Sequence, residues 1–168
     1  ATSCDNSTIP PFEEIDRLII ESPDSAQILL EGIDTITLSK NGKIAYRLLK
    51  EKLSDHNLVH VSDSSFATLA EKELKNENPH LILLSLYYKG RVEYNNKDFG
   101  ESITTLMKAS EIAKQLQDHI YMGLIYITMS DIYYNILNTP QRLKYARLAF
   151  DEFTIANKPK LINRASLS

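Results

Sequence analysis

An internal repeat is the feature of this sequence that most restricts its fold. Residues 81–116 align with residues 121–156 at an offset of 40, so that 87–94 (YYKGRVEY) match 127–134 (ITMSDIYY). In both copies a short polar turn follows, and then a segment with small residues on one face. A repeat of roughly this length indicates a supersecondary unit that stacks on its neighbours, because one unit cannot bury its apolar side alone.

The hydrophobic pattern of both copies is typical of helices. Phe99, Ile103 and Leu106 recur at spacings of four and three residues, and Ala113 continues the same stripe. Segment 79–95 is apolar on more than one side, so we expect it to lie between neighbouring helices. No Asn-Gly or Asp-Gly turn separates two alternating runs, so no sheet is predicted.

Capping residues and prolines divide the chain into helices. Thr139 before Pro140 is predicted to cap a helix, and Asp98 with Glu101 three residues later resembles a capping box. Helices are predicted over 11–21, 23–33, 41–54, 63–77, 79–95, 98–116, 119–137 and 140–156, with a further fragment near 160–167.

The composition is that of an ordinary globular domain. The 168 residues are 43% hydrophobic and 24% charged, which is enough for a core and gives no indication of disorder. The net charge is −3 and lysine and arginine form no long cluster, so no direct contact with nucleic acid is predicted. No run approaches the roughly 20 apolar residues that a membrane span needs.

These features resemble the tetratricopeptide repeat (TPR) family, in which antiparallel helix pairs stack into a right-handed superhelix. Small residues in that family let the two helices of a pair approach closely, and matching positions hold Gly90, Ser102 and Ala109, then Ser130 and Ala149. The resemblance implies an all-α fold with a flexible tether over 1–10 and a single TPR-like domain over 11–168. Clear repeats are expected at about 79–116 and 119–156, and degenerate repeats at about 11–77.

The sequence departs from the family pattern at several positions. Lys89 and Glu93 stand where leucine and tyrosine are usual, and Arg142 stands where alanine is usual. The spacing also exceeds the family's repeat length of about 34 residues. Longer helices accommodate the additional residues in about a turn and a half. These departures limit what the family implies about binding geometry, but not what it implies about the fold.

The resemblance also implies a binding surface on the first helix of each pair, which lines the concave side of the superhelix. The matching positions are Tyr87, Arg91, Tyr94 and Asn95, followed by Ile127, Asp131, Tyr134 and Asn135. Aromatic rings bury area and amides bond a peptide backbone, so a protein or peptide partner is predicted. A solvated groove without a ligand is the alternative. The Lys and Asn with which some members hold a terminal carboxylate are absent, so that clamp is not expected.

The single cysteine, Cys4, excludes an internal disulfide. Residues 1–4 (ATSC) resemble the end of a bacterial lipoprotein signal, in which the cysteine is lipidated, and the polar residues that follow suit a tether. The chain is therefore predicted on the periplasmic side of a bacterial envelope, touching the membrane only through a lipid on Cys4. A terminal cysteine without a role and a cytoplasmic location are the alternatives.

No motif indicates catalysis, a metal or a cofactor. His56 and His60 are four residues apart, but no glutamate lies between them as in a zinc-protease motif, so they are interpreted as surface residues. Phosphate-binding glycine loops, nucleophile elbows and paired cysteines are also absent. The sequence therefore predicts a protein that is not an enzyme.

The leading functional hypothesis is a scaffold that binds a protein or peptide, as the sensing or assembly module of an envelope or regulatory protein. The order of the segments resembles the N-terminal sensor regions of Bacteroidetes-type regulators, in which a repeat domain can precede a membrane span and a helix-turn-helix or kinase module. The alternative is a structural module that forms a homo-oligomer through the segment after Pro159.

Overall fold

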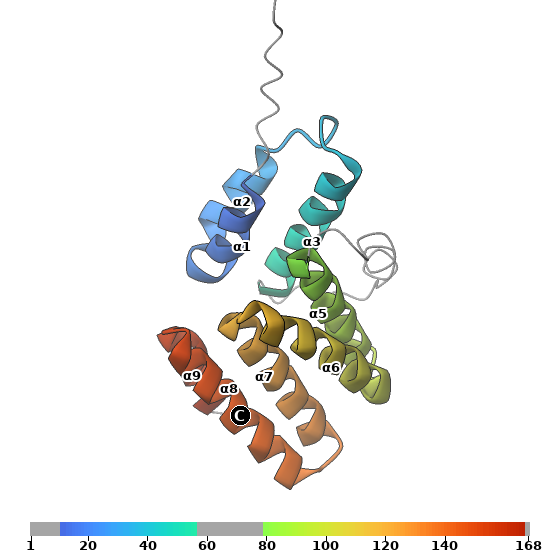
Figure 1. The fold of residues 1–168 in the computed structure, drawn as a ribbon, viewed down its shortest axis with the longest axis vertical. Helices are drawn as coiled ribbons and strands as arrows, with labels where there is room; N and C mark the ends of the chain where they lie inside the picture. The colour runs from blue at the N-terminus through green and yellow to red at the C-terminus, as the bar shows by residue number, and fades with distance from the viewer. Residues whose placement is uncertain (1–10, 57–78, 167–168) are drawn as a thin grey trace, which may run out of the picture. The chain divides into compact units, whose positions relative to one another are not determined.

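The computed structural model describes residues 11–56 and 79–166, and within these ranges the protein is all-helical, as predicted (Figure 1). The chain divides into two compact units, Ala1–Val61 and Ser62–Ser168. The predicted tether over 1–10 with Cys4 and the predicted helix over 63–77 lie outside the described residues. The described helices are α1 (Phe12–Glu21), α2 (Pro23–Glu31), α3 (Lys40–His56), α5 (Pro79–Asn95), α6 (Phe99–Leu116), α7 (His119–Asn135), α8 (Thr139–Ile155) and α9 (Pro159–Ser166).

The N-terminal unit packs α1, α2 and α3 against one another. Ile15 and Ile19 are one helical turn apart on α1 and are both fully buried, with Ala26 and Leu30 of α2 and Leu49 of α3 beside them. Pro23 occupies the first turn of α2, where its missing N–H costs nothing, so α2 starts directly after Ser22 ends α1. The unit is therefore a small three-helix cluster with an aliphatic core.

A buried ion pair crosses this cluster from α1 to α3. Lys52 is only 4% exposed. Its Nζ lies 2.7 Å from Oδ1 of Asp16 and also donates to the Asp16 backbone carbonyl at 3.0 Å. Burying either charge alone is costly, so the two side chains depend on each other. Sequence analysis did not identify this pair, because no local spacing relates residues 16 and 52.

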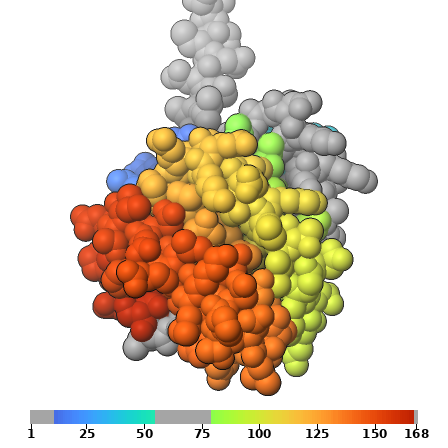
Figure 2. All heavy atoms as spheres, turned by 60° about the horizontal axis from the view of Figure 1, so that its bottom comes forward, coloured from blue at the N-terminus to red at the C-terminus, as the bar shows by residue number. Residues whose placement is uncertain are grey.

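The C-terminal unit consists of two helix hairpins, α5–α6 and α7–α8, followed by α9. The first helices of the hairpins begin at Pro79 and His119 and both contain 17 residues, so the 40-residue offset of the sequence is also the offset of the structure. Helix α7 contacts α5, α6 and α8, while α9 packs on α8. The spheres of α8 and α9 touch on one side of this unit (Figure 2).

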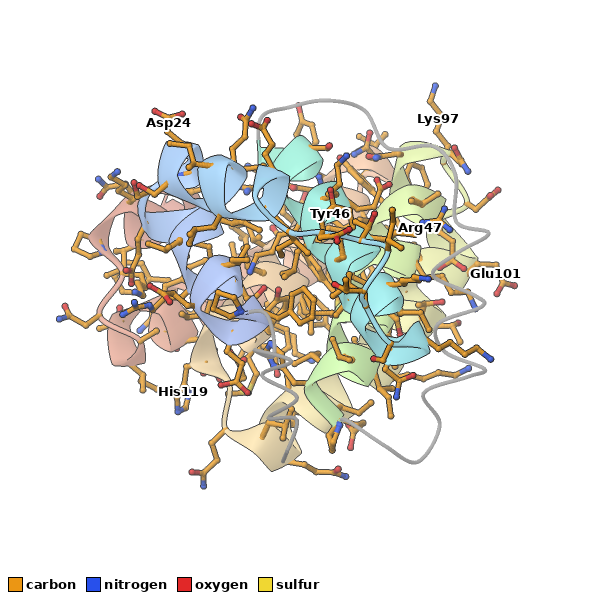
Figure 3. The ribbon with its side chains drawn as sticks, turned by 90° about the horizontal axis from the view of Figure 1, so that it is seen from above. Asp24, Tyr46, Arg47, Lys97, Glu101 and His119 are labelled. Atoms are coloured by element: carbon orange, nitrogen blue, oxygen red, sulfur yellow. The ribbon has the colours of Figure 1, made fainter. Side chains whose placement is uncertain are left out.

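The turns of the C-terminal unit repeat every 20 residues. In each turn one non-glycine residue adopts a left-handed conformation, and the next residue's N–H donates to the carbonyl five positions earlier, as in the Schellman motif. At the first turn this bond runs from Asp98 to Glu93 over 2.9 Å, and the left-handed Lys97 projects into solvent (Figure 3). The left-handed residues are Lys97, Gln117, Leu137 and Asn157, with φ of 67°, 54°, 59° and 52°.

Two of the predicted caps are wrong in detail. Asn138 caps α8 by accepting from the Gln141 N–H at 3.2 Å, and Thr139 is already the first helical residue. Asp98 precedes α6 as expected, but its side chain makes no capping bond, so the capping box with Glu101 does not form. All predicted helix ends within the described residues nevertheless lie within two residues of the observed ones.

Each hairpin is closed by a serine that donates to the backbone of the facing helix. In the first hairpin the Ser102 hydroxyl donates to the Gly90 carbonyl at 2.7 Å. In the second hairpin the equivalent positions exchange roles, and the Ser130 hydroxyl donates to the Arg142 carbonyl at 3.1 Å. A hydroxyl can reach a helical carbonyl only where the backbones are close, so the small residues of the sequence pattern do mark helix–helix contacts.

Candidate functional site

The eight residues predicted to bind a partner lie on α5 and α7, at positions that correspond through the 40-residue offset. Their side chains differ in exposure. Tyr87 and Ile127 are only 4% and 1% exposed. The Tyr87 ring packs edge-to-face against Tyr88 and Tyr121, with centroids 5.1 and 5.5 Å apart. Neither side chain offers surface to a partner in this structure.

The other six residues reach the surface towards the C-terminal ends of their helices. On each helix the tyrosine and the asparagine follow the first residue by three and four positions, so the three residues share one helical face. We call these six residues the candidate face: Arg91, Tyr94 and Asn95 of α5, and Asp131, Tyr134 and Asn135 of α7.

An arginine lies on the tyrosine of each half of the candidate face. The guanidinium carbon of Arg91 is 5.6 Å from the centroid of the Tyr94 ring, within reach of a cation–π contact. Tyr134 is 60% exposed, and the guanidinium carbon of Arg142, from α8, lies 4.8 Å from the centroid of its ring. Arg142 appeared in the sequence only as a departure from a small residue, so its place beside this face was missed.

Asp131 is the acidic centre of the candidate face. Its side chain is 33% exposed, and its Oδ2 lies 4.0 Å from Nη2 of Arg164 on α9. The side-chain amide of Asn135 donates to the Asp131 backbone carbonyl at 2.7 Å. Burial raises the pKa of Asp131 above its usual range, although Arg164, Arg91 and Arg142 all act to lower it.

Arginines of α5, α8 and α9 therefore all favour the charged form of this carboxylate of α7, and Arg164 lies in ion-pair contact with it. Arg164 was not among the predicted site residues, since nothing in the sequence links the last helix to Asp131. A guanidinium carries five N–H donors in a planar fork that suits carboxylates and phosphates. The arrangement is chemically suited to holding an anionic group beside an aromatic ring, and it contains no nucleophile with an adjacent base.

Other polar pairs of the C-terminal unit stand apart from this face. His119 Nδ1 lies 2.7 Å from Glu152 Oε2, which links α7 to α8. Burial raises the pKa of Glu93, and a hydrogen bond from Thr105 acts to lower it.

Among the described residues no group of three or more His, Cys, Asp or Glu side chains is placed to hold a metal ion. No helix in the described ranges has the length and apolar character needed to cross a membrane.

Comparisons of the chain with protein-family models, with curated proteins and with solved structures gave no match.

Proposed function

We propose that this protein is a non-enzymatic, TPR-like scaffold that binds an extended peptide or a protein segment at the candidate face. The single observation that carries the proposal is the repetition of the face. Tyr94 and Asn95 recur as Tyr134 and Asn135, one 40-residue unit later, on first helices that contact each other. Equivalent groups repeated along stacked helices suit a ligand that is itself extended and has a repeating backbone.

The groups on the face have properties that favour peptide binding. An aromatic ring loses little conformational entropy when it becomes buried, and Tyr134 is largely exposed, with much of its surface still to bury. The face stands on helices of 17 residues whose turns are closed by backbone hydrogen bonds. A rigid platform reduces the ordering cost of association.

The self-association alternative requires an uncovered apolar side on the segment after Pro159. Helix α9, the segment proposed for it, packs on α8 of the same chain. Ala165 of α9 is 4% exposed, and Leu161 and Ile162 are half-buried. The apolar side of α9 is thus already covered in part within one chain, so we retain peptide binding as the proposed function.

We also propose that the protein is exported and anchored through a lipid on Cys4. It would then act as a sensing or assembly module on the periplasmic side of the envelope. The support is the lipoprotein-like run ATSC at residues 1–4. Labelling native cells with an alkyne-bearing fatty acid should mark the wild-type protein and not a Cys4→Ser variant. Equal labelling of the two would exclude lipidation at this residue.

Peptide binding is tested with the full chain on an array of peptides of varied composition. We expect a subset to bind, and Tyr134→Ala to weaken that subset by about tenfold, as for loss of an aromatic anchor. Met107→Ala is the matched control, because Met107 is 53% exposed and belongs to α6, which contributes no residue to the candidate face. An array without any binder, or one on which Tyr134→Ala and Met107→Ala behave alike, would overturn the proposed function.

A further inference from the structure

We infer that the segment bound at the candidate face carries an apolar side chain, which Ile136 and Leu137, in the turn after α7, bury beside Tyr134. We call these three residues the apolar tip: Tyr134, Ile136 and Leu137. This inference rests on the proposed function and specifies the partner's chemistry.

The apolar tip exposes three large side chains within four residues, where α7 passes into the turn before α8 (Figure 1). Tyr134 is 60% exposed, Ile136 45% and Leu137 88%. Their backbones are close in space, because the Leu137 N–H donates to the Tyr134 carbonyl at 3.1 Å. Single exposed apolar residues are common on protein surfaces, but a group of them on one segment indicates an interaction site.

The equivalent turn of the first hairpin has no apolar tip. Through the 40-residue offset, the counterparts of Ile136 and Leu137 are Asn96 and Lys97, which are both polar. The backbone of the two turns is nevertheless the same, with one left-handed residue followed by an N–H that donates five positions back. The turn therefore forms with polar residues, and its fold does not require the apolar side chains of the second hairpin.

Leu137 is also unfavourable for the backbone conformation that it adopts. Its φ is 59°, and a side chain with a Cβ is strained in this left-handed region. Among the described residues, the other non-glycine positions with positive φ hold the polar residues Lys97, Gln117 and Asn157. Leucine at position 137 thus adds backbone strain and buries almost none of its side chain in the folded protein. Such a residue is expected where a partner requires its side chain.

The apolar tip continues the candidate face, since Tyr134 belongs to both. Residues 134–137 (YNIL) include no Asp, Glu, Lys or Arg, so this part of the surface offers no ion pair to a ligand. Aliphatic and aromatic side chains gain free energy when they cover exposed leucine and isoleucine. The occupant of the tip is therefore an apolar side chain of the peptide that lies on the candidate face.

A membrane surface and a second copy of the chain are poorer matches for the apolar tip. Segments that lie in a bilayer interface are amphipathic helices with lysines and arginines on their polar side. The tip ends in a turn, and residues 134–141 (YNILNTPQ) include neither lysine nor arginine. A stable interface between two copies buries about 800 Å² on each partner, which is far more than three side chains supply. One side chain of a bound peptide needs no larger surface.

The test measures fluorescence anisotropy of the full chain with two labelled, uncharged peptides of equal length. One peptide alternates Leu and Phe with Ser and Gln, and the other has Ala in place of every Leu and Phe. We expect the apolar peptide to bind about tenfold more tightly. Added salt should not reduce this difference, because salt screens charges and the contact is apolar. Phosphatidylcholine vesicles are the third probe, in a co-sedimentation assay.

Variants of Leu137 then separate binding from stability. Leu137→Asn should weaken the apolar peptide by about fivefold, because asparagine tolerates the left-handed conformation but has no apolar side chain. Leu137→Met should bind as the wild type does, since it keeps an apolar side chain of similar volume. Leu137→Gly should lose affinity while its free energy of unfolding rises. Gln117→Gly is the matched control, because it relieves the same backbone strain at the turn between α6 and α7 and should leave the affinity unchanged.

The outcomes separate this inference from the proposed function. Equal binding of the two peptides, or binding of neither while peptides on the array bind, would overturn the apolar preference and leave the proposed function standing. Failure of both peptides, together with an array that shows no binder, would remove the proposed function as well. Wild-type affinity in Leu137→Asn would remove Leu137 from the site. Vesicle binding or a dimer in sedimentation that Leu137→Asn abolishes would assign the tip to a membrane or to a second copy, and would overturn the inference.

Discussion

Gly123 lies where α7 meets α8, and a single methyl group added there tests how closely these helices pack. A Cβ at this position would lie 2.3 Å from Cε1 of Phe153 and 2.5 Å from Cδ1, whereas carbon atoms in contact are about 3.5–4.0 Å apart. Phe153 is fully buried, so its ring has no open space to enter. Gly123→Ala must therefore displace the ring or separate the helices.

Two opposing effects set the magnitude. Replacing glycine by alanine within a helix stabilises it by about 1 kcal/mol. Overpacking a tight core costs about 1–3 kcal/mol and occasionally more, and an overlap of about 1 Å with a buried ring belongs at the upper end of that range. We expect Gly123→Ala to lower the free energy of unfolding by about 1–2 kcal/mol.

Gly100 provides a matched control for the same substitution. It lies in the first turn of α6, and a Cβ there would meet nothing within 4 Å. Gly100→Ala gains the helical preference without a clash, so it should raise the free energy of unfolding by about 0.5–1 kcal/mol. The two variants change the same atoms and should differ in sign.

Urea unfolding followed by the near-ultraviolet circular dichroism of tyrosine measures both changes. Every tyrosine except Tyr46 belongs to the unit Ser62–Ser168, so this signal reports mainly on the hairpins. If Gly123→Ala raises the midpoint as Gly100→Ala does, the close packing of α7 on α8 is wrong. A double-mutant cycle with Phe153→Leu gives a second check. The smaller side chain should relieve the clash, with a coupling of about 1 kcal/mol.

Two further substitutions test local features of the two units. Leu137 is 88% exposed at a left-handed position. Leu137→Gly should therefore raise the free energy of unfolding by about 1 kcal/mol, whereas Leu137→Ala keeps the strained φ and should give no such gain. Equal melting temperatures of the two variants would contradict this expectation. Lys52→Met should lower the free energy of unfolding by about 3 kcal/mol, because the Asp16 carboxylate stays buried without the lysine charge. Adding Asp16→Leu should recover most of that stability. Urea unfolding followed by circular dichroism at 222 nm measures both changes, and no recovery in the double variant would contradict the role of the pair.

The helix bounds could be predicted because the sequence marks them with local signals. Pro79 and Pro159 each begin a helix, and the apolar stripe of α6 continues to the turn before Asp118. The errors at helix ends have the same local origin. Leu137 was predicted to continue α7, since leucine favours helices and glycine is the usual left-handed residue, but its φ of 59° ends the helix there.

The candidate site could be predicted only in part. The resemblance to the repeat family pointed to positions on α5 and α7 that the 40-residue offset relates, but which of these side chains are buried depends on neighbouring helices. Tyr87 lies one turn before Arg91 on the same face of α5, where the Tyr121 ring of α7 packs against it. Arg142 could not be placed either. Ser130 supplies the small side chain at that helix contact, which leaves the long side chain of Arg142 at the Tyr134 ring.

The charge at Asp131 bears on whether its contact with Arg164 contributes to stability. A carboxylate kept for stability is normally paired so well that its pKa falls. Here burial outweighs Arg164, Arg91 and Arg142 together, and the pKa of Asp131 rises. The charged form of Asp131 is therefore less favourable in the folded protein than in water. Asp131→Asn should leave the free energy of unfolding unchanged or higher, whereas the loss of a stabilising ion pair would lower it, and urea unfolding of the two proteins measures the difference.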